Sequence, residues 1–309
     1  MVTESSGNRR HGPLWAAVIA VVIVVVWACL PATRRLTQRF FGSLRVQKVQ
    51  AVNVDLSSFV GPNANSTLQQ MVSQMISDKV TVTTNEKTQA APDAGAASQL
   101  AGFHVQLLSA RKDSPELAVA GMHAFDLTVD RARLQAILKE AGRSDLALPQ
   151  SIDGATVAVK IPRTVHARYG SCPGRPSATA DVATPTPSSM QYTDCVILTE
   201  GPSPEVNVPS GLDIQQLAEI GLELAGMTPA QAQEFLHNVN WKSTLGVSIP
   251  RFMRSYEAVK VNGVQGTLLN MAGRRGPTYS LLWAKNGTVY SLTGYGNSGD
   301  AVSLANSVQ

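Results

Sequence analysis

The hydrophobic positions of this chain form one uninterrupted apolar run, several alternating stretches and several helical stripes. The run extends from Leu14 to Leu30 and contains no charged residue. As a helix, with two flanking residues at each end, it would be roughly 30 Å long, which is the thickness of the hydrocarbon core of a bilayer. It therefore predicts a transmembrane helix over residues 14–32, after a short tail (1–13) and before a basic linker (33–43).

Alternating apolar residues follow at many places, and this period is typical of strands with one buried face. They predict strands over residues 45–56, 79–84, 103–108, 117–129, 156–161, 196–199, 244–249, 258–261, 264–269, 279–284 and 289–293. Asn262-Gly263 and Asn286-Gly287 lie between the last strands, where a two-residue type I′ hairpin turn favours these residues. We therefore expect antiparallel sheet, with a C-terminal β meander plus helix over residues 244–309.

Helical stripes alternate with these strands. Helices are expected to begin at residues whose side chains can cap the first turn: Ser66 or Thr67, Asp130, Thr228 and Ser298. Thr228 and Gln231 have the spacing of a capping box, with Pro229 at the first helical position. Another stripe, over residues 212–225, ends at Gly226. Helices together with antiparallel strands predict an α+β fold for residues 44–309.

Two stretches, Thr88–Ser98 and Gly174–Ser189, show neither pattern and are rich in Ala, Pro, Ser and Thr. This composition predicts loops. The second stretch is flanked by Cys172 and Cys195, which are the only cysteines outside the apolar run. We expect a disulfide between them, which would stabilise the fold by about 3 kcal/mol. The alternative is a catalytic thiol.

That alternative would use His166 as the base and Asp194 to orient it. No sequence feature places the imidazole near either sulfur. The histidines lack the spacing of metal ligands, and no phosphate-binding glycine loop is present. The sequence therefore predicts no cofactor, no metal site and no enzymatic activity.

The charge of the chain is unevenly distributed. There are 26 basic and 22 acidic residues, a net charge of +4, but residues 1–49 hold seven of the basic and one of the acidic residues. The other 260 residues are therefore slightly acidic, with a net charge of −2. This distribution does not favour nucleic-acid binding. Arg34, Arg35 and Arg39 would suit anionic lipid head groups, or they are ordinary charges flanking a span.

The orientation of the span involves a conflict. Arg9 and Arg10 precede it and five basic residues soon follow it, so that charge counting places the long part inside. A large domain behind a first apolar segment is normally exported, however, and paired cysteines favour an oxidising compartment. We expect residues 44–309 outside the cytoplasm. A cleaved signal peptide and a lipoprotein anchored at Cys29 remain alternatives to the uncleaved anchor.

Residues 255–268 (SYEAVKVNGVQGTL), 281–293 (LLWAKNGTVYSLT) and 301–308 together resemble a bacterial extracytoplasmic domain of unknown function. That domain occurs in membrane-anchored anti-sigma factors and related envelope proteins. The resemblance implies a curved antiparallel sheet with helices packed on one face, similar to the periplasmic lipoprotein-carrier fold, and no catalysis. This chain departs from the pattern in its tail, since residues 1–13 contain no cysteine and only one histidine, so that direct capture of a sigma factor is not expected.

Aromatic side chains gather in the C-terminal part, among them Trp241, Trp283, Tyr279 and Tyr290. Packing of the sheet against its helices explains most of them. The alternative is a hydrophobic cleft on the concave face for a lipid, an acyl chain or a peptide.

These features together predict a single-pass protein of the bacterial inner membrane whose extracytoplasmic domain binds or senses. Its expected partners are the lipid bilayer and another envelope or membrane protein, and a hydrophobic ligand is a further candidate. A tethered carrier or assembly factor for a lipid or lipoprotein is the alternative function, and an unrecognised hydrolase is the third.

Overall fold

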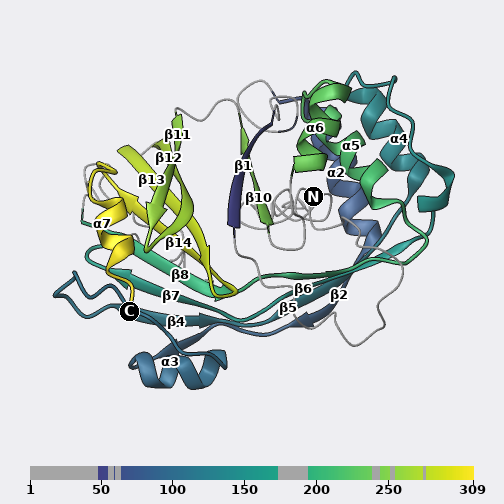
Figure 1. Ribbon diagram of the computed structural model, residues 1–309. Coiled ribbons are helices and arrows are strands. Elements are labelled where there is room, and N and C mark those ends of the chain that lie inside the picture. The colour runs from purple at the N-terminus through teal and green to yellow at the C-terminus, as the bar shows by residue number, and fades with distance from the viewer. Residues whose placement is uncertain are drawn as a thin grey trace, which may run out of the picture.

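The computed structural model describes residues 48–54, 59, 64–172, 194–238, 244–250, 255–273 and 276–309. The predicted transmembrane run, the tail and the basic linker lie outside these residues. Among the residues that are described, no helix is long and apolar enough to cross a membrane. The described part of the chain has an α+β fold of antiparallel sheets and helices, as predicted (Figure 1).

The described strands form three sheets. The eight-stranded sheet is antiparallel and contains, in spatial order, β11 (Ser255–Val261), β12 (Val264–Gly273), β13 (Gly276–Lys285), β14 (Thr288–Tyr295), β8 (Val196–Pro202), β7 (Thr164–Tyr169), β4 (Glu116–Ala120) and β3 (Gln89–Ala91). The four-stranded sheet, also antiparallel, contains β2 (Val80–Asn85), β5 (His123–Thr128), β6 (Thr156–Ile161) and β9 (Glu205–Asn207). The third is a parallel pair of β1 (Lys48–Val54) and β10 (Thr244–Pro250).

The two larger sheets behave as one layer with a bend. β2 leads into β3, β4 into β5, β6 into β7 and β8 into β9. The order β9-β6-β5-β2 in the smaller sheet therefore matches the order β8-β7-β4-β3 in the larger one, strand for strand. Figure 1 shows the resulting long strands running below the β1–β10 pair. The two sheets are separate in hydrogen bonding, but the chain passes directly from a strand of one into a strand of the other at four places.

Contacts of Glu86 join neighbouring chain segments where the two sheets meet. Its backbone N–H donates to the carbonyl oxygen of Met122 over 3.0 Å, and its carboxylate accepts from the Met122 N–H over 2.9 Å. Arg163 donates to both carboxylate oxygens, over 2.7 and 3.0 Å. A Cβ at Gly121 would lie 2.4 Å from the Glu86 Cβ, so the close approach requires glycine at position 121.

The predicted hairpin turns are confirmed. Asn262 and Gly263 have φ values of 47° and 83°, and Asn286 and Gly287 have values of 53° and 83°. Positive φ at both central residues is the requirement of a type I′ turn. These two turns set the antiparallel registers of β11 with β12 and of β13 with β14.

The helices form two groups at different ends of the long strands (Figure 1). One group contains α2 (Ser66–Lys79), α4 (Arg131–Glu140), α5 (Ile214–Leu224) and α6 (Pro229–Asn238). The other contains α3 (Ala94–Ala101) and α7 (Ala301–Asn306), and a 3₁₀ turn spans Gln150–Ile152. The largest hydrophobic core lies between the eight-stranded sheet and this second group.

Two of the predicted caps are confirmed. The Asp130 carboxylate accepts from the Arg133 N–H over 3.0 Å at the start of α4. At the start of α6, Thr228 and Gln231 make both bonds of a capping box, over 3.0 and 3.3 Å. Helix α2 is instead capped by Asn65, whose side chain accepts from Leu68, and not by the predicted Ser66 or Thr67.

The prediction of a loop over residues 88–98 is wrong. These residues contain β3 and most of α3. Asp93 caps the helix by accepting from the Ala96 N–H over 2.8 Å, and Gly102 ends it with a φ of 81°. Small residues dominate the stretch, but its two ends carry ordinary start and stop signals for a helix.

The prediction of a strand over residues 103–108 is also wrong. Val105 donates to the Ser98 hydroxyl over 3.0 Å, and Leu108 donates to the Tyr169 hydroxyl over 2.9 Å. Only an isolated bridge from Leu108 to Val308 resembles sheet pairing. The side chains of Ser98 and Tyr169 thus satisfy the backbone N–H groups of Val105 and Leu108, while Leu107 pairs with Gln309 through two backbone hydrogen bonds.

Three smaller predictions need correction, and two strands were not predicted. The strand predicted over residues 117–129 is interrupted between β4 and β5, and the missed strands are β7 and β9. β10 pairs in parallel with β1, so the C-terminal meander begins at β11 and not at residue 244. The last helix begins at Ala301, and its N-cap is Asp300 instead of the predicted Ser298. The Asp300 side chain makes no capping hydrogen bond.

Candidate functional site

The central strands of the eight-stranded sheet have two chemically different faces. Buried residues alternate with half-buried ones along β7, with Val165, Ala167 and Tyr169 buried. β14 shows the same alternation, with Tyr290 and Leu292 buried. Because successive side chains of a strand point to opposite faces, the buried set forms one face and the half-buried set the other. The buried face packs against α3 and α7.

The half-buried face is mixed, since the apolar Ile197 and Leu282 lie on it beside hydroxyl and imidazole side chains. We use the name polar face for its hydroxyl and imidazole side chains, which are Ser280, Ser291, Thr293, Thr199 and His166. The strand registers place Ser291 beside Thr199 and Thr199 beside His166. The His166 Nδ1 lies 2.8 Å from the Thr199 Oγ1. The row therefore crosses three adjacent strands and offers donors and acceptors of hydrogen bonds without a cluster of charge.

The predicted disulfide lies at one end of this face and is confirmed. Cys172 follows β7 and Cys195 precedes β8, and their sulfurs are bonded with the Cα atoms 4.7 Å apart. Neither sulfur is a free thiol, so the catalytic-thiol alternative is contradicted in this structure. Residues 173–193, which include the predicted loop over 174–189, lie outside the described residues.

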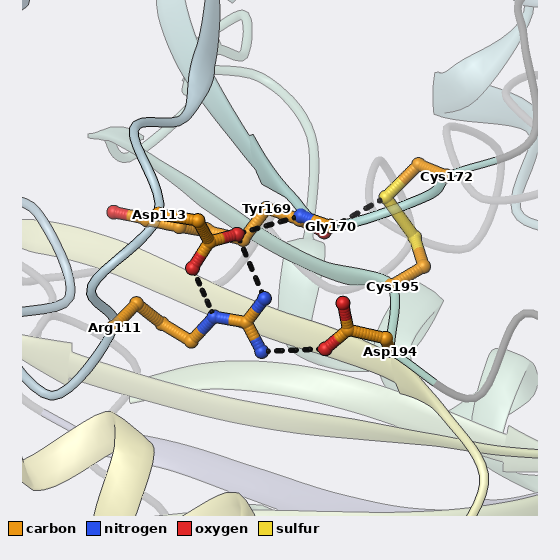
Figure 2. The surroundings of a disulfide bond; sticks show 7 residues. All are labelled: Arg111, Asp113, Tyr169, Gly170, Cys172, Asp194 and Cys195. Atoms are coloured by element: carbon orange, nitrogen blue, oxygen red, sulfur yellow. Dashed lines mark hydrogen bonds and ion pairs between the residues drawn. A yellow bond between two sulfur atoms is a disulfide. The ribbon is translucent and has the colours of Figure 1, made fainter.

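Arg111 braces the two chain segments that carry the disulfide. Its Nε and Nη2 donate to the two carboxylate oxygens of Asp113, over 2.7 and 2.8 Å, and its Nη1 donates to Asp194 over 3.0 Å. Asp113 also accepts from the N–H of Gly170, over 2.8 Å. Figure 2 shows the guanidinium between the two aspartates, beside the disulfide. A planar fork of donors suits two carboxylates at once.

The ion pair between Arg111 and Asp113 shifts the pKa values of both side chains. Hydrogen bonds from Arg111 lower the pKa of Asp113 to about 2. The Asp113 carboxylate in turn raises the pKa of Arg111. Asp194, which the sequence suggested as an orienter of His166, pairs with Arg111 instead, and its side chain is 67% exposed. His166 and Asp194 therefore do not form a base and its orienter here.

Gly170 is required by the geometry of the brace. It has a φ of 71°, and an added Cβ would lie 2.3 Å from the backbone oxygen of Asp194. Only glycine allows both the left-handed conformation and this close approach at low cost. The end of β7 and the start of β8 are thus held together by a disulfide, an arginine fork and a glycine contact.

A buried carboxyl group lies on the opposite face of the same sheet. Glu200 in β8 is 2% exposed, and its Oε1 accepts from the Gln106 N–H over 2.7 Å. Its Oε2 has no hydrogen-bond partner among the described residues. Burial raises the pKa of Glu200 to about 7. Sequence analysis missed this residue, although it occupies an apolar position in the alternation of Val196 and Leu198.

Of the predicted aromatic residues, Trp283, Tyr279 and Tyr290 are 1%, 3% and 6% exposed. All three belong to the core beneath α3 and α7, which agrees with the core-packing interpretation. Trp283 and Tyr290 stack with ring centroids 5.1 Å apart. Trp241 lies outside the described residues, as do Arg34, Arg35 and Arg39. The hydrophobic cleft stays a prediction.

The remaining candidates are weaker. An open groove along α4 is lined in part by Gln135, whose side chain is already bonded to the backbone of Leu146 and Leu148. In the described ranges, no three His, Cys, Asp or Glu side chains are placed to hold a metal ion.

Comparison with known proteins gives no relative for this chain: no family model, curated protein or solved structure matches it. The resemblance of the C-terminal segments to an envelope domain therefore stays a prediction.

Proposed function

We propose that this chain is a membrane-anchored binding or sensing module of the bacterial cell envelope, with its folded domain outside the cytoplasm and without catalytic activity. The observation that carries the proposal is the Cys172–Cys195 disulfide. Disulfides of this kind persist in oxidising compartments and are rare in the cytoplasm. Together with the apolar run Leu14–Leu30, the bridge favours an exported domain on a membrane stem.

The polar face is the proposed binding surface. Its side chains are half-buried and lie on central strands of the sheet. They comprise four hydroxyl groups and one imidazole. Such a surface suits a polar ligand or the backbone of a partner protein better than an acyl chain, because an acyl chain would leave these polar groups without hydrogen bonds. Occupancy would then be passed to another membrane protein.

The alternative, a tethered carrier for a lipid or lipoprotein, is supported by the bend of the sheet (Figure 1). Against it, the aromatic side chains that would line an apolar cleft are packed in the core. An environment-sensitive lipid probe separates the two functions. We expect no saturable binding of the probe at micromolar concentrations, and saturable binding that a lipid displaces would favour the carrier.

The location is tested with two measurements in whole cells. A topology reporter fused after Gln309 should be active only outside the cytoplasm. Thiol alkylation of the denatured chain from quenched cells should label Cys172 and Cys195 only after reduction. In the Cys172→Ser variant, Cys195, which is 0% exposed in the fold, should then be labelled without reductant. Two free thiols, together with a reporter active in the cytoplasm, would overturn the proposal.

The binding surface is tested by site-specific photo-crosslinking of the full chain in its native membrane. A photoreactive residue in place of Ser291 on the polar face should give a defined adduct that disappears in the presence of excess unlabelled chain. The matched control is the same residue in place of Val82, which is 64% exposed on β2. Equal labelling from both positions would assign no special role to the polar face.

A further inference from the structure

We propose that Glu200 is an internal proton-binding site that latches residues 102–110 onto the eight-stranded sheet. We call residues 102–110 the clasp. The inference rests on the proposed function, which it deepens by naming the proton as a ligand that the module senses outside the cytoplasm.

The clasp is held to the sheet by three side chains from three different strands. Glu200 of β8 accepts from the backbone N–H of Gln106 over 2.7 Å, and Tyr169 of β7 accepts from that of Leu108 over 2.9 Å. Tyr290 of β14 donates to the side-chain oxygen of Gln106 over 2.8 Å. Gln106 therefore contacts both the carboxyl group and one of the two phenols, which makes it the centre of the attachment.

The clasp also holds the C-terminus of the chain. Leu107 and Gln309 exchange two backbone hydrogen bonds, of 2.9 and 3.1 Å, and Ser109 donates to the carbonyl oxygen of Ser307 over 3.1 Å. The C-terminal residues directly follow α7, which covers the core. Val105 and Leu108 of the clasp are themselves buried in that core. Release of the clasp would thus expose apolar surface and free the end of α7.

The environment of Glu200 favours its neutral form. The titratable groups nearest to it in the network are the phenols of Tyr290 and Tyr169, which carry no charge near neutral pH. Arg163, which precedes β7, is engaged by Glu86. The sequence of α3, AGAASQLA, contains no titratable side chain, and His104 of the clasp is exposed.

A carboxylate at this position would be poorly compensated. One oxygen accepts a single hydrogen bond, and the other has no partner in the described part of the chain. An unpaired buried charge is far more costly than a neutral carboxyl group. Burial accordingly raises the pKa of Glu200 from 4.5 to about 7.

The direction of the pH effect follows from linkage. When the clasp opens, water reaches Glu200, whose pKa returns toward 4.5 from about 7. Between these two values the open state has lost the proton and the closed state has kept it. The opening constant therefore rises with pH, by up to about tenfold per pH unit, and levels off above the closed-state pKa. Low pH keeps the clasp closed and neutral pH loosens it.

The test is hydrogen–deuterium exchange of the full chain in detergent micelles, from about pH 4.5 to about pH 8.5, with rates corrected for intrinsic exchange. Protection of residues 105–109 in the wild type should fall by up to about tenfold per pH unit up to about pH 7 and then level off. Residues 156–161 of β6 should change much less. In Glu200→Gln, a neutral isostere, protection of the clasp should not depend on pH.

The matched control is Glu205→Gln on β9, the same chemical change at a side chain that is 67% exposed. It should follow the wild type. A wild-type clasp with protection independent of pH, or a Glu200→Gln variant that keeps the full pH dependence, would overturn the proposal.

A second measurement covers the case in which Glu200→Gln does not fold. Infrared spectroscopy of the wild type at pH 6 should show the carbonyl band of a protonated carboxyl group, which should disappear with a midpoint near pH 7. Absence of the band at pH 6 would refute the latch. If hydrogen exchange and infrared spectroscopy refute the latch, the topology and crosslinking results are unaffected. If the topology reporter is active in the cytoplasm, the sensing role outside the cytoplasm is refuted, but the proton linkage of Glu200 can still be measured.

Discussion

At the scale of single residues, two carboxyl groups of this domain show how surroundings decide protonation. Asp113 accepts hydrogen bonds from Arg111 and Gly170, so its charged form is favoured and its pKa is lowered to about 2. Glu200 lies in the core with one hydrogen bond, so its neutral form is favoured and its pKa is raised to about 7. The first group stabilises the fold at neutral pH, and the second does so at acidic pH.

The brace at the disulfide predicts unequal effects at its two aspartates. Asp113→Asn should lower the free energy of unfolding by about 1 kcal/mol at pH 7, a value reduced because the side chain is partly exposed. Asp194→Asn, which removes one contact of an exposed group, should cost less than about 0.5 kcal/mol. Urea denaturation of both variants measures the difference.

The pH dependence of the Asp113 effect has a definite sign. Since the folded-state pKa is about 2 and the ordinary value is 3.8, the contribution of Asp113 is present above about pH 4 and disappears as the pH falls through about 2. The stability difference between the wild type and Asp113→Asn should therefore shrink over this interval. A difference that stays constant from pH 5 to pH 2 would exclude the Arg111 pairing as its cause.

At the scale of elements, the hairpins depend on residues that tolerate positive φ. Gly263→Ala should destabilise the domain by about 1 kcal/mol, because its φ is 83° and no atom lies near the added Cβ, so that backbone strain is the only cost. Thermal or chemical unfolding measures this effect. Gly211→Ala is the matched control, since Gly211 also has open space around it but no positive φ. Equal effects of the two substitutions would contradict the turn assignment.

The disulfide is the main covalent constraint on the strands β7 and β8. Replacing Cys172 and Cys195 by serine together should lower the free energy of unfolding by about 3 kcal/mol, because the closed loop restricts the unfolded chain. Adding reductant to the wild type should have a similar effect and should not change the stability of the double variant. If reductant breaks the disulfide of the wild type but leaves its free energy of unfolding unchanged, this stabilising role is contradicted.

At the scale of the whole molecule, the C-terminus is held by the clasp through backbone bonds. Deleting residues 307–309 should lower the free energy of unfolding by about 1–3 kcal/mol and increase hydrogen exchange in the clasp, because these bonds are lost. Gln309→Ala keeps the backbone and should behave like the wild type. Unchanged exchange of residues 105–109 after the deletion would show that the two segments are not coupled.

Much of the secondary structure was predictable because its causes are local. Asp130 caps α4, Thr228 and Gln231 cap α6, and the Asn-Gly pairs form the expected turns, all through atoms a few residues apart. The disulfide was predictable by exclusion, since only two cysteines lie outside the apolar run. The prediction for residues 103–108 was wrong because their alternating apolar residues are buried by packing under a sheet and not by pairing within it.

The sequence by itself determined the caps, the turns, the alternation of the strands and the pair of cysteines available for a bridge. Only the tertiary structure decided that β1 pairs in parallel with β10, that four strand pairs join into one bent layer, and that Glu200 is buried under the clasp. The physical reason is the range of the interactions. A cap or a turn is stabilised by neighbours along the chain, whereas the burial of a carboxyl group depends on segments brought together from distant parts of it.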